Sequence, residues 1–429
     1  MKYIILSVFG RQKERIAATR IYNLAKYLSL TKKDIYTILS NDFYGSAYDY
    51  NFCKRVYDLP LKFIKKSKKT SKKEHTDLTK LQKDINNFIL NNISSYKGYR
   101  SFKSNNLYFL EYNNKYINKI LTEIGVDKNT ILITSNGPSK INYFGYRIKK
   151  KNPCIFWVAD YRDLNQNNPH KSDKFNFKGK KMDKLAFKYA DLITTVSQGT
   201  KEQNIKNAKN IGLEISDKSY VLYNGFSKNE INNSEKINIS LKYKNILSTE
   251  KVIIVYTGTI YPSMRIDLFM ETLKKVENIL FIYAGSSFNL VDHFSKKLGI
   301  ASKVINLKFI PREEAEFLQK NSDILLLLKA YVKENGILTG KFFEYLQRNK
   351  KILSLGDQDE EYNLICRNLK NVDILPYNKE RIVKYLKNLR KEDLKENYDP
   401  NIERFSWEYL AKEFDDFVSQ KLNERKSNI

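Results

Sequence analysis

Short apolar runs alternate with amphipathic segments along most of the chain. Residues 3–9 have the pattern of a buried strand, residues 16–28 that of an amphipathic helix, and residues 34–39 that of a second strand. A strand–helix–strand unit of this length predicts a parallel sheet. Further strands are expected in the first half at 129–135, 153–159, 192–196 and 219–223.

The alternation begins again in the second half. Apolar runs at 252–257, 279–285, 304–310, 323–328 and 351–356 are separated by helical patterns. This predicts a second doubly wound domain, which agrees with a length of 429 residues, too long for one compact core. The fold class is therefore expected to be α/β with two Rossmann-like domains. The polar stretch 227–250 is interpreted as a linker, which places the domains at 1–226 and 251–400 and a C-terminal helix at 401–429.

Residues 60–118 interrupt the first domain. A lysine-rich segment with a small apolar patch, 61–73, is followed by helical patterns near 76–93 and 108–124. One interpretation of this basic, helical insertion is contact with anionic lipid headgroups or with a polyprenyl-diphosphate acceptor. The other is a solvated loop, and the sequence leaves both open.

The amino-acid composition excludes few classes of protein. No run approaches the ~18 apolar residues of a membrane span, and the N-terminus lacks the pattern of a signal peptide, so a cytoplasmic location is expected. Three cysteines and three histidines lie far apart, which suggests neither a disulfide framework nor a metal site. A net charge of +28 implies an anionic partner, such as nucleic acid, lipid or a phosphorylated small molecule. The alternative is a bacterial genome rich in A and T, which would explain part of the lysine excess without any function.

Charged residues gather at the end of the strand that begins near residue 153. Asp160, Arg162 and Asp163 follow its apolar run. Because ligands of open α/β sheets bind outside the carboxyl ends of strands, these three are candidates for a site. The alternative is a strand-end ion pair in which Asp163 caps the next element.

The most informative stretch is 335–346. A glycine-marked loop leads into a helix whose buried stripe is Phe342, Tyr345 and Leu346. Lys341 and Glu344 share another stripe at the start of this helix. A helix start offers free N–H groups to a phosphate, Lys341 adds charge, and Glu344 can accept hydrogen bonds from sugar hydroxyls. An exposed Lys–Glu pair without function is the alternative.

The Lys-x-x-Glu-Tyr helix between two strands resembles the nucleotide-binding segment of glycosyltransferase family 4. Other segments resemble that family in the same order along the chain: the Asp-x-Arg-Asp strand end at 160–163, Ala-Asp-Leu-Ile-Thr-Thr-Val-Ser at 190–197, Asn-Gly-Phe at 224–226, the Thr-Gly loop at 257–258 and Ser-Trp-Glu at 406–408. The resemblance implies a GT-B fold, in which two Rossmann-like domains face each other, the nucleotide-sugar binds the C-terminal one and a C-terminal helix crosses back.

The resemblance also implies a function. It suggests a retaining, metal-independent hexosyltransferase that uses a UDP- or GDP-sugar and no further cofactor. The implied acceptor is a glycan or a polyprenyl-diphosphate-linked molecule of bacterial surface polysaccharide synthesis, as for capsule or lipopolysaccharide, at the inner face of the plasma membrane. In that family the residue matching Glu344 contacts the ribose and the residue matching Lys341 lies near the diphosphate. Asp163 or Asp160 would orient the acceptor hydroxyl, with Arg162 beside them.

The expected donor site also includes positions at which this chain departs from the family. The family often has a glutamate at the position of Gly336 and a basic pair at the positions of Thr259 and Met264. Arg265 is the nearest replacement, and we expect it to reach the diphosphate. The complete set expected to bind the donor is Gly258, Thr259, Arg265, Gly336, Ile337, Leu338, Thr339, Lys341 and Glu344.

Three other classes of function stay open at this point. The charge and the 13% aromatic content are compatible with a nucleic-acid-binding protein, although no recognised binding motif stands out. A sugar-nucleotide epimerase of GT-B architecture would change a UDP-sugar without an acceptor. A non-catalytic partner subunit is compatible with the departures at Gly336, Thr259 and Met264.

Overall fold

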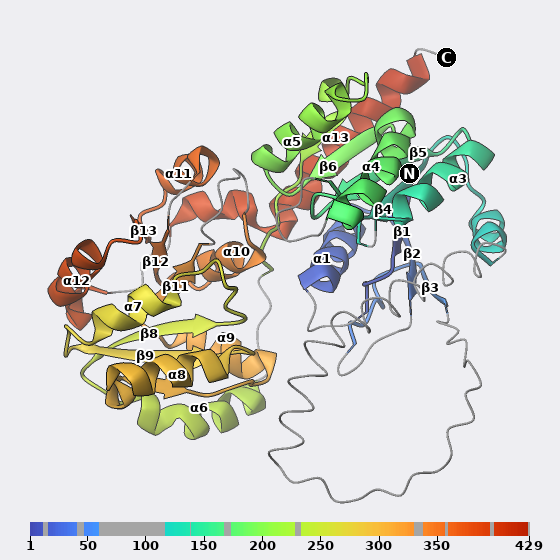
Figure 1. The fold of residues 1–429 in the computed structure, drawn as a ribbon. Coiled ribbons are helices and arrows are strands. Elements are labelled where there is room, and N and C mark those ends of the chain that lie inside the picture. Colours follow the sequence, from blue (N-terminus) through green and yellow to red (C-terminus); the bar gives the residue numbers. More distant parts are fainter. Residues whose placement is uncertain are drawn as a thin grey trace, which may run out of the picture. The chain divides into compact units, whose positions relative to one another are not determined.

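The computed structural model describes residues 1–11, 16–40, 47–59, 116–137, 139–166, 173–227, 233–329, 338–356, 359–394 and 399–427. The basic segment 61–73 and the helical pattern at 76–93 lie outside these ranges, whereas residues 116–124 of the pattern at 108–124 are helical. The chain forms two compact units (Figure 1). The first comprises Met1–Thr195, Asn204–Tyr220 and Asp415–Ile429, and the second comprises Val196–Gln203 and Val221–Phe414.

The first unit is built on a seven-stranded sheet in the order β3-β2-β1-β4-β5-β6-β7. The pairs from β3 to β6 are parallel, as the alternating pattern predicts. Chain order reverses between β1 and β4, so their carboxyl ends flank the switch point of this sheet. The strands are β1 (Lys2–Ser7), β2 (Asp34–Ser40), β3 (Arg55–Leu59), β4 (Thr130–Ser135), β5 (Phe156–Tyr161), β6 (Leu192–Thr195) and β7 (Ser219–Val221).

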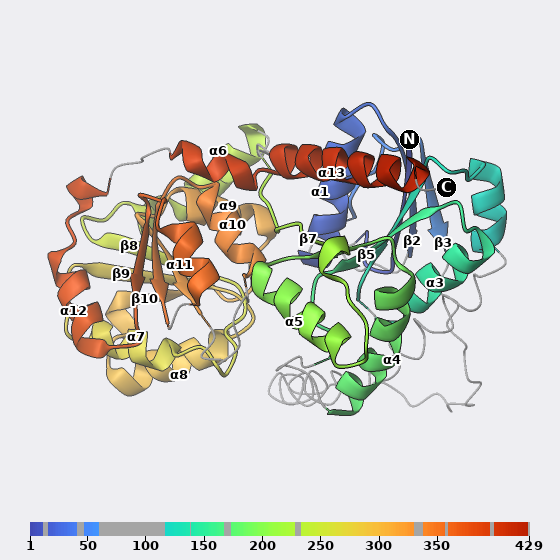
Figure 2. The ribbon, with the colours of Figure 1, turned by 90° about the horizontal axis from the view of Figure 1, so that it is seen from above.

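Helices cover both faces of this sheet, which explains why its central strands β1, β4, β5 and β6 are buried along nearly their whole length. Ile4 of β1 faces a core shared with Phe144 of α3 and Phe187 of α4. The neighbouring Tyr3 points to the other face, where its hydroxyl donates to Asp415 of α13 at 2.7 Å. Figure 2 shows α1 and α13 along one side and α3 and α4 along the other. The helices are α1 (Ile16–Leu30), α3 (Ile141–Lys151), α4 (Asp173–Tyr189), α5 (Gln198–Lys209) and α13 (Trp407–Ser427).

The second unit contains a six-stranded sheet in the order β10-β9-β8-β11-β12-β13, and its paired strands are parallel. The switch point lies between β8 and β11, so the segments that follow these two strands are the expected place for a ligand. The strands are β8 (Val252–Thr257), β9 (Ile279–Ala284), β10 (Val304–Asn306), β11 (Ile324–Leu328), β12 (Lys351–Leu355) and β13 (Val372–Leu375).

Two cores sandwich this second sheet. Val255 packs with Phe342 of α10 and Leu318 of α9 on one face, and Ile254 packs with Phe269 of α7 on the other. The unit is therefore doubly wound, as the second half of the sequence predicts. Its helices are α6 (Asn233–Leu247), α7 (Ile266–Leu273), α8 (Phe288–Leu298), α9 (Arg312–Lys320), α10 (Gly340–Leu346), α11 (Glu360–Cys366) and α12 (Lys379–Asn388).

The expected α/β class with two Rossmann-like parallel sheets is confirmed. The stretch expected to link the domains, 227–250, contains helix α6, whose Tyr243 is buried against Phe317 of α9. The expected C-terminal helix begins later than 401, because Pro400–Phe405 forms a 3-10 turn before α13. Residues of α13 belong to both units, with the change at Asp415. The predicted domain boundaries at 226, 250 and 400 otherwise stay predictions.

Candidate functional site

The loop that follows β8 and the start of α10 meet at the switch point of the second sheet. Gly258 has a φ of +122°, a conformation that suits glycine. A Cβ at this position would lie 2.7 Å from Nζ of Lys341, so the ammonium lies directly against the glycine backbone. The same nitrogen is 3.7 Å from the centroid of the Tyr256 ring. The predicted residues Gly258 and Lys341 are therefore brought together.

Lys341 makes no hydrogen bond or ion pair with any side chain or backbone group that the structure describes. Burial lowers the pKa of its ammonium to about 7, while the Glu344 carboxylate acts in the opposite direction. An anion that entered this site would supply the missing counter-charge and raise that pKa. The arrangement is thus suited to a phosphate or another small anion.

Glu344 lies one turn further along α10, where Arg312 is its one hydrogen-bond partner among the described residues. Its Oε1 accepts a hydrogen bond from Nη2 of Arg312 at 3.0 Å, and 37% of its side chain is exposed. Arg312 is fixed in turn by Oε1 of Glu316 at 2.9 Å. Oε2 of Glu344 accepts no hydrogen bond from the described residues, so it is available to a ligand hydroxyl.

A set of buried polar contacts fixes α10 on β8. Nε2 of Gln319 donates to Oγ1 of Thr257 at 2.7 Å, and Nε of Arg348 donates to Oε1 of Gln319 at 3.0 Å. The hydroxyl of Tyr345 accepts from the Thr257 backbone N–H at 3.3 Å. These contacts hold the helix that carries Lys341 and Glu344 against the carboxyl end of the central strand. Arg312 and Gln319 were not identified from the sequence. Both lie on α9, and no local sequence pattern indicates that this helix contacts α10.

The remaining residues of the expected donor site have different surroundings. Oγ1 of Thr259 lies 2.8 Å from Oγ of Ser286, and both side chains are exposed beside Gly258. Leu338 is buried in the core, so only its backbone can face a ligand, and Thr339 precedes α10 with extended backbone. Gly336 and Ile337 lie outside the described residues.

The guanidinium of Arg265 is paired locally. It makes hydrogen bonds of 2.8 to 3.1 Å with both carboxylate oxygens of Asp267, two residues further on. Half of the Arg265 side chain is exposed. Contact with a diphosphate stays a prediction for Arg265, and it would require this pair to open or to be shared.

In the first unit, Asp160 is a buried member of an ion pair. Its carboxylate accepts from Nη2 and Nε of Arg20 at 2.8 and 3.2 Å, from Ser135 at 3.1 Å and from Thr194 at 2.8 Å. Although burial opposes ionisation, the Arg20 guanidinium and the Thr194 hydroxyl hold the pKa of Asp160 below its ordinary value. The geometry favours a positioning role for Asp160, because its oxygens already have partners.

Arg162 and Asp163 lie on the loop that follows β5, beside the end of β4. Nε of Arg162 donates to the backbone oxygen of Asn136 at 2.9 Å, and its guanidinium carbon is 6.0 Å from the centroid of Phe9. Nδ2 of Asn136 in turn contacts the backbone oxygen of Asp163 at 3.3 Å. The Asp163 side chain is exposed, so of the three predicted residues it is the one whose carboxylate a ligand can reach.

A buried carboxylate that sequence reasoning missed supports this loop. Asp183 of α4 accepts from the Tyr161 hydroxyl at 2.9 Å, from Asn165 at 2.7 Å and from Gln166 at 3.0 Å. A Cβ at Gly179, one turn earlier in α4, would lie 2.0 Å from the backbone oxygen of Asn165. The close helix and the Asp183 carboxylate together fix the loop that carries Asp163.

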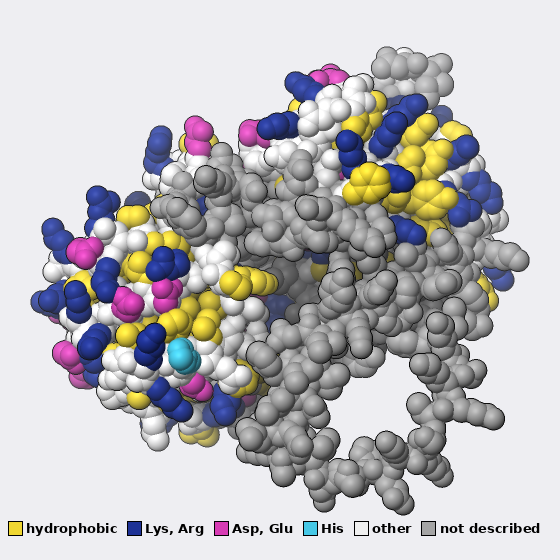
Figure 3. Space-filling view, in the orientation of Figure 1, with side chains coloured by type: hydrophobic (Ala, Val, Ile, Leu, Met, Phe, Trp, Pro, Cys, Tyr) yellow, Lys and Arg dark blue, Asp and Glu magenta, His cyan; other side chains and the backbone are white. Residues whose placement is uncertain are grey.

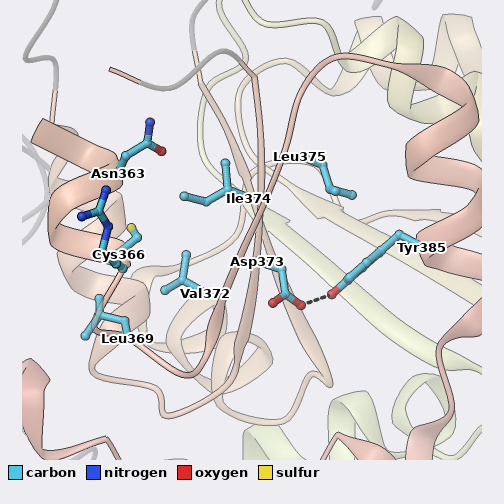
Figure 4. A pocket seen from close by; sticks show the side chains of 9 residues that line it. Asn363, Cys366, Leu369, Val372, Asp373, Ile374, Leu375 and Tyr385 are labelled. Carbon is cyan, nitrogen blue, oxygen red and sulfur yellow. Dashed lines mark hydrogen bonds between the residues drawn. The ribbon is translucent and has the colours of Figure 1, made fainter. Parts of the chain in front are cut away.

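An open groove of about 530 Å³ lies elsewhere, between α11 and the edge strand β13 (Figure 4). Its lining is mixed, with apolar side chains around Cys366 and the polar Asn363, Arg367 and Asp373. Oδ2 of Asp373 accepts from the Tyr385 hydroxyl at 2.6 Å. Burial raises the pKa of the Cys366 thiol to about 12, so it is not a nucleophile at neutral pH. None of the residues predicted for a site lines this groove.

Within the described ranges, no group of three His, Cys, Asp or Glu side chains is arranged to hold a metal ion. None of the described helices combines the length and the apolar character that a membrane span requires. A metal-independent reaction stays a prediction.

Comparison with known proteins identifies the fold. No family model matches the sequence, and no curated protein matches it. Among solved structures, HepE from Anabaena in complex with UDP is similar, with a TM-score of 0.62 and 13% identity over 98% of this chain and 100% of that chain. The lipopolysaccharide outer core galactosyltransferase WaaB has a TM-score of 0.57 and 16% identity, covering 98% and 100% of the two chains. WaaG, a glycosyltransferase involved in lipopolysaccharide biosynthesis, has a TM-score of 0.56 and 11% identity, covering 97% and 99%.

Identities this low show the fold alone, and they do so over nearly the whole chain. The two parallel sheets are the two Rossmann-like domains of the GT-B glycosyltransferase fold. Membership of glycosyltransferase family 4 stays a prediction.

Proposed function

We propose that the chain is a glycosyltransferase that transfers a hexose from a UDP- or GDP-sugar. Three things support this: the GT-B fold, the Lys-x-x-Glu-Tyr motif at the switch point, and the ligands of similar structures. HepE from Anabaena has been solved with UDP, with UDP and glucose, and with UDP-glucose. WaaB is a galactosyltransferase.

The observation that carries the proposal is the ammonium of Lys341 against the Gly258 backbone, which pairs with no anion among the described residues. In the proposed complex the diphosphate of the donor lies against this ammonium and the Gly258 backbone. The ribose hydroxyls donate to the free Oε2 of Glu344. The Thr259 and Ser286 hydroxyls, 2.8 Å apart, provide further donors at the position where family 4 usually has an arginine.

The proposed chemistry uses fixed charge. As the bond between the sugar and the diphosphate breaks, negative charge grows on the leaving group. A preorganised cation stabilises that charge with little reorganisation, in a retaining reaction that needs no metal. On the acceptor side, the exposed Asp163 is the candidate to orient the attacking hydroxyl, and Asp160 with Arg20 supports the strand that precedes it.

The biological role is proposed by the same reasoning. WaaB and WaaG act in lipopolysaccharide synthesis, which is compatible with a glycan or polyprenyl-diphosphate-linked acceptor and a role in bacterial surface polysaccharide synthesis. Such acceptors would place the protein in the cytoplasm at the inner face of the plasma membrane. The basic segment 61–73, proposed to contact that membrane, lies outside the described residues.

Thermal unfolding in the presence of nucleotides tests the donor site. UDP, GDP and ADP are each added to the wild type, to Lys341→Met and to a matched control, Lys296→Met, which removes an exposed lysine from α8. A nucleotide at ~100 times its Kd adds roughly 2.7 kcal/mol of stability. We expect UDP or GDP to stabilise the wild type and the control, and to stabilise Lys341→Met by clearly less. No shift with any nucleotide, or an equal shift in Lys341→Met, would refute the proposed site.

A further inference from the structure

Two neighbouring helices of the first unit present rings and cations on their outer faces. In α3, the exposed Arg147 and Lys150 form one helical stripe with Tyr143 and Tyr146, which are half-buried and pack partly against the core, while the opposite face is buried. In α4, Phe177 is 63% exposed, and the exposed lysines that follow at positions 180, 181, 184 and 188 continue its stripe. Figure 3 shows such yellow side chains surrounded by dark blue ones on this unit.

The two stripes form one surface, which we call the α3–α4 surface and define as the outward side chains of residues 143–151 and 177–189. The helices pack together, and the rings of Tyr146 and Tyr189 lie 4.7 Å apart across the junction. Cations cover the rings: Lys181 lies 5.3 Å from the Phe177 ring and Arg147 lies 5.7 Å from the Tyr143 ring. Aromatic and cationic groups therefore alternate on both helices.

This surface has no exposed counter-charge of its own. Residues 141–151 include no acidic residue, and the one carboxylate among positions 177–189 is Asp183, which is fully buried and accepts three hydrogen bonds. Lys149 is neutralised separately by Asp191 at 2.7 Å. The remaining cations produce a field of one sign that attracts a polyanion.

We propose that the α3–α4 surface docks on a bilayer that contains anionic phospholipid. Phenyl and phenol rings that stand among cations suit the headgroup region, where rings enter the interface and lysines meet anionic lipid. A single strand of nucleic acid would instead need open ring faces for its bases, and here each of several rings already has a cation over it. The proposal rests on these two helices and does not depend on the proposed transferase activity.

Vesicle binding by the full chain tests the charges. The variant Lys180→Gln, Lys181→Gln, Lys184→Gln, Lys188→Gln is compared with a control, Lys274→Gln, Lys275→Gln, Lys296→Gln, Lys297→Gln, which removes four exposed lysines from the second unit. The two variants have the same net charge. Each lysine near an anionic membrane contributes about a fivefold change in partitioning. We therefore expect the α4 variant to lose binding several-hundredfold on vesicles of equal parts phosphatidylcholine and phosphatidylglycerol, and the control to lose far less. Equal losses would overturn the proposal.

A fluorescent reporter tests the contact itself. The natural tryptophans, Trp157 and Trp407, are buried, so Phe177→Trp adds an exposed reporter on the α3–α4 surface. Its control is Phe309→Trp, at a 73% exposed position of the second unit. We expect anionic vesicles to shift the emission of the Phe177→Trp reporter to the blue and brominated lipids to quench it, with no change for the reporter at position 309. The absence of a change at position 177, or salt-sensitive binding of oligouridine that the α4 lysines control without vesicle binding, would overturn the membrane proposal.

Discussion

Each unit contains a charged side chain near the carboxyl edge of its sheet. The charge in the first unit has a counter-ion, whereas the charge in the second has none among the described residues. In the first unit, the carboxylate of Asp160 and the guanidinium of Arg20 are 1% and 2% exposed and are paired at 2.8 Å. In the second unit, Lys341 has a glycine backbone and a tyrosine ring around its ammonium but no described anion within bonding distance. A paired charge can hold strands together, whereas an unpaired one is unfavourable until a ligand arrives. The difference assigns a structural role to the first and a binding role to the second.

The largest expected effect comes from breaking the pair. Asp160→Asn removes the carboxylate charge that pairs with the buried Arg20, and the loss of one partner of a buried ion pair lowers the free energy of unfolding by about 3–5 kcal/mol. Urea unfolding followed by the fluorescence of Trp157, in the same strand, measures it. Asp163→Asn, on the exposed loop, is the control and should change stability by less than about 0.5 kcal/mol. Similar small effects of both variants would show that the pair does not stabilise the sheet.

The pair also predicts a pH dependence. The folded-state pKa of Asp160 is lowered, so its contribution is present above the ordinary aspartate pKa and is lost as the pH falls toward the lowered value. The stability difference between the wild type and Asp160→Asn should therefore shrink in acid. A difference that does not change with pH would contradict the ion-pair interpretation.

The unpaired charge should have the opposite effect on stability. Lys341→Met removes a buried ammonium that has no partner among the described residues, so we expect the ligand-free protein to become more stable by about 1–2 kcal/mol at neutral pH. Lys296→Met on α8 is the exposed control and should have little effect. Because the folded-state pKa of Lys341 is about 7, the folded protein has released a proton that the unfolded chain retains up to about pH 10. The stability of the wild type should therefore rise, relative to the methionine variant, as the pH rises from about 7 to about 10, so that the advantage of the variant shrinks. A destabilised Lys341→Met at neutral pH would contradict the account.

A smaller effect is expected from Arg312, which holds Oε1 of Glu344 at 3.0 Å. The pair is partly exposed, and such pairs contribute about 0.2–1 kcal/mol, so Arg312→Gln should weaken UDP or GDP binding by about two- to fivefold. In a Glu344→Gln background the same change should have no further effect, because its partner has already lost its charge. Calorimetric titration of the wild type, the two single variants and the double variant gives the coupling free energy between Arg312 and Glu344. Additive losses would mean that Arg312 acts elsewhere.

The sequence predicts the sheets well because both are buried on two faces. Each central strand is then a short continuous apolar run, which a polar chain displays clearly. The edge strands β3 and β13 are less buried and contain charged residues, and the sequence did not predict them. Helix α6 was hidden inside the stretch expected to be a linker. Its packing residues, Ile239, Tyr243 and Ile246, have helical spacing, but lysines, asparagines and serines dominate the composition around them.

Local periodicity predicts the site only where its members are close in sequence, and Gly258 was grouped with Lys341 by the family resemblance alone. Lys341 and Glu344 stand three residues apart on one helix, so periodicity brings them together. Arg312 and Arg20 reach their carboxylate partners across 32 and 140 residues, and no local pattern encodes such contacts. Asp160 and Asp163 were grouped as one charged strand end, although the structure buries the first and exposes the second.

The central claim is that the Lys341 ammonium awaits the phosphates of a nucleotide. Calorimetric titration with UDP and with GDP near pH 7.5–8, repeated in buffers of different ionisation enthalpy, tests it most directly, since a pKa of about 7 leaves the lysine largely neutral there. The account predicts that one nucleotide binds with uptake of a fraction of a proton, and that Lys341→Met binds it about tenfold to a hundredfold more weakly with no uptake. Binding of equal strength in the variant, or uptake that persists without Lys341, would contradict it.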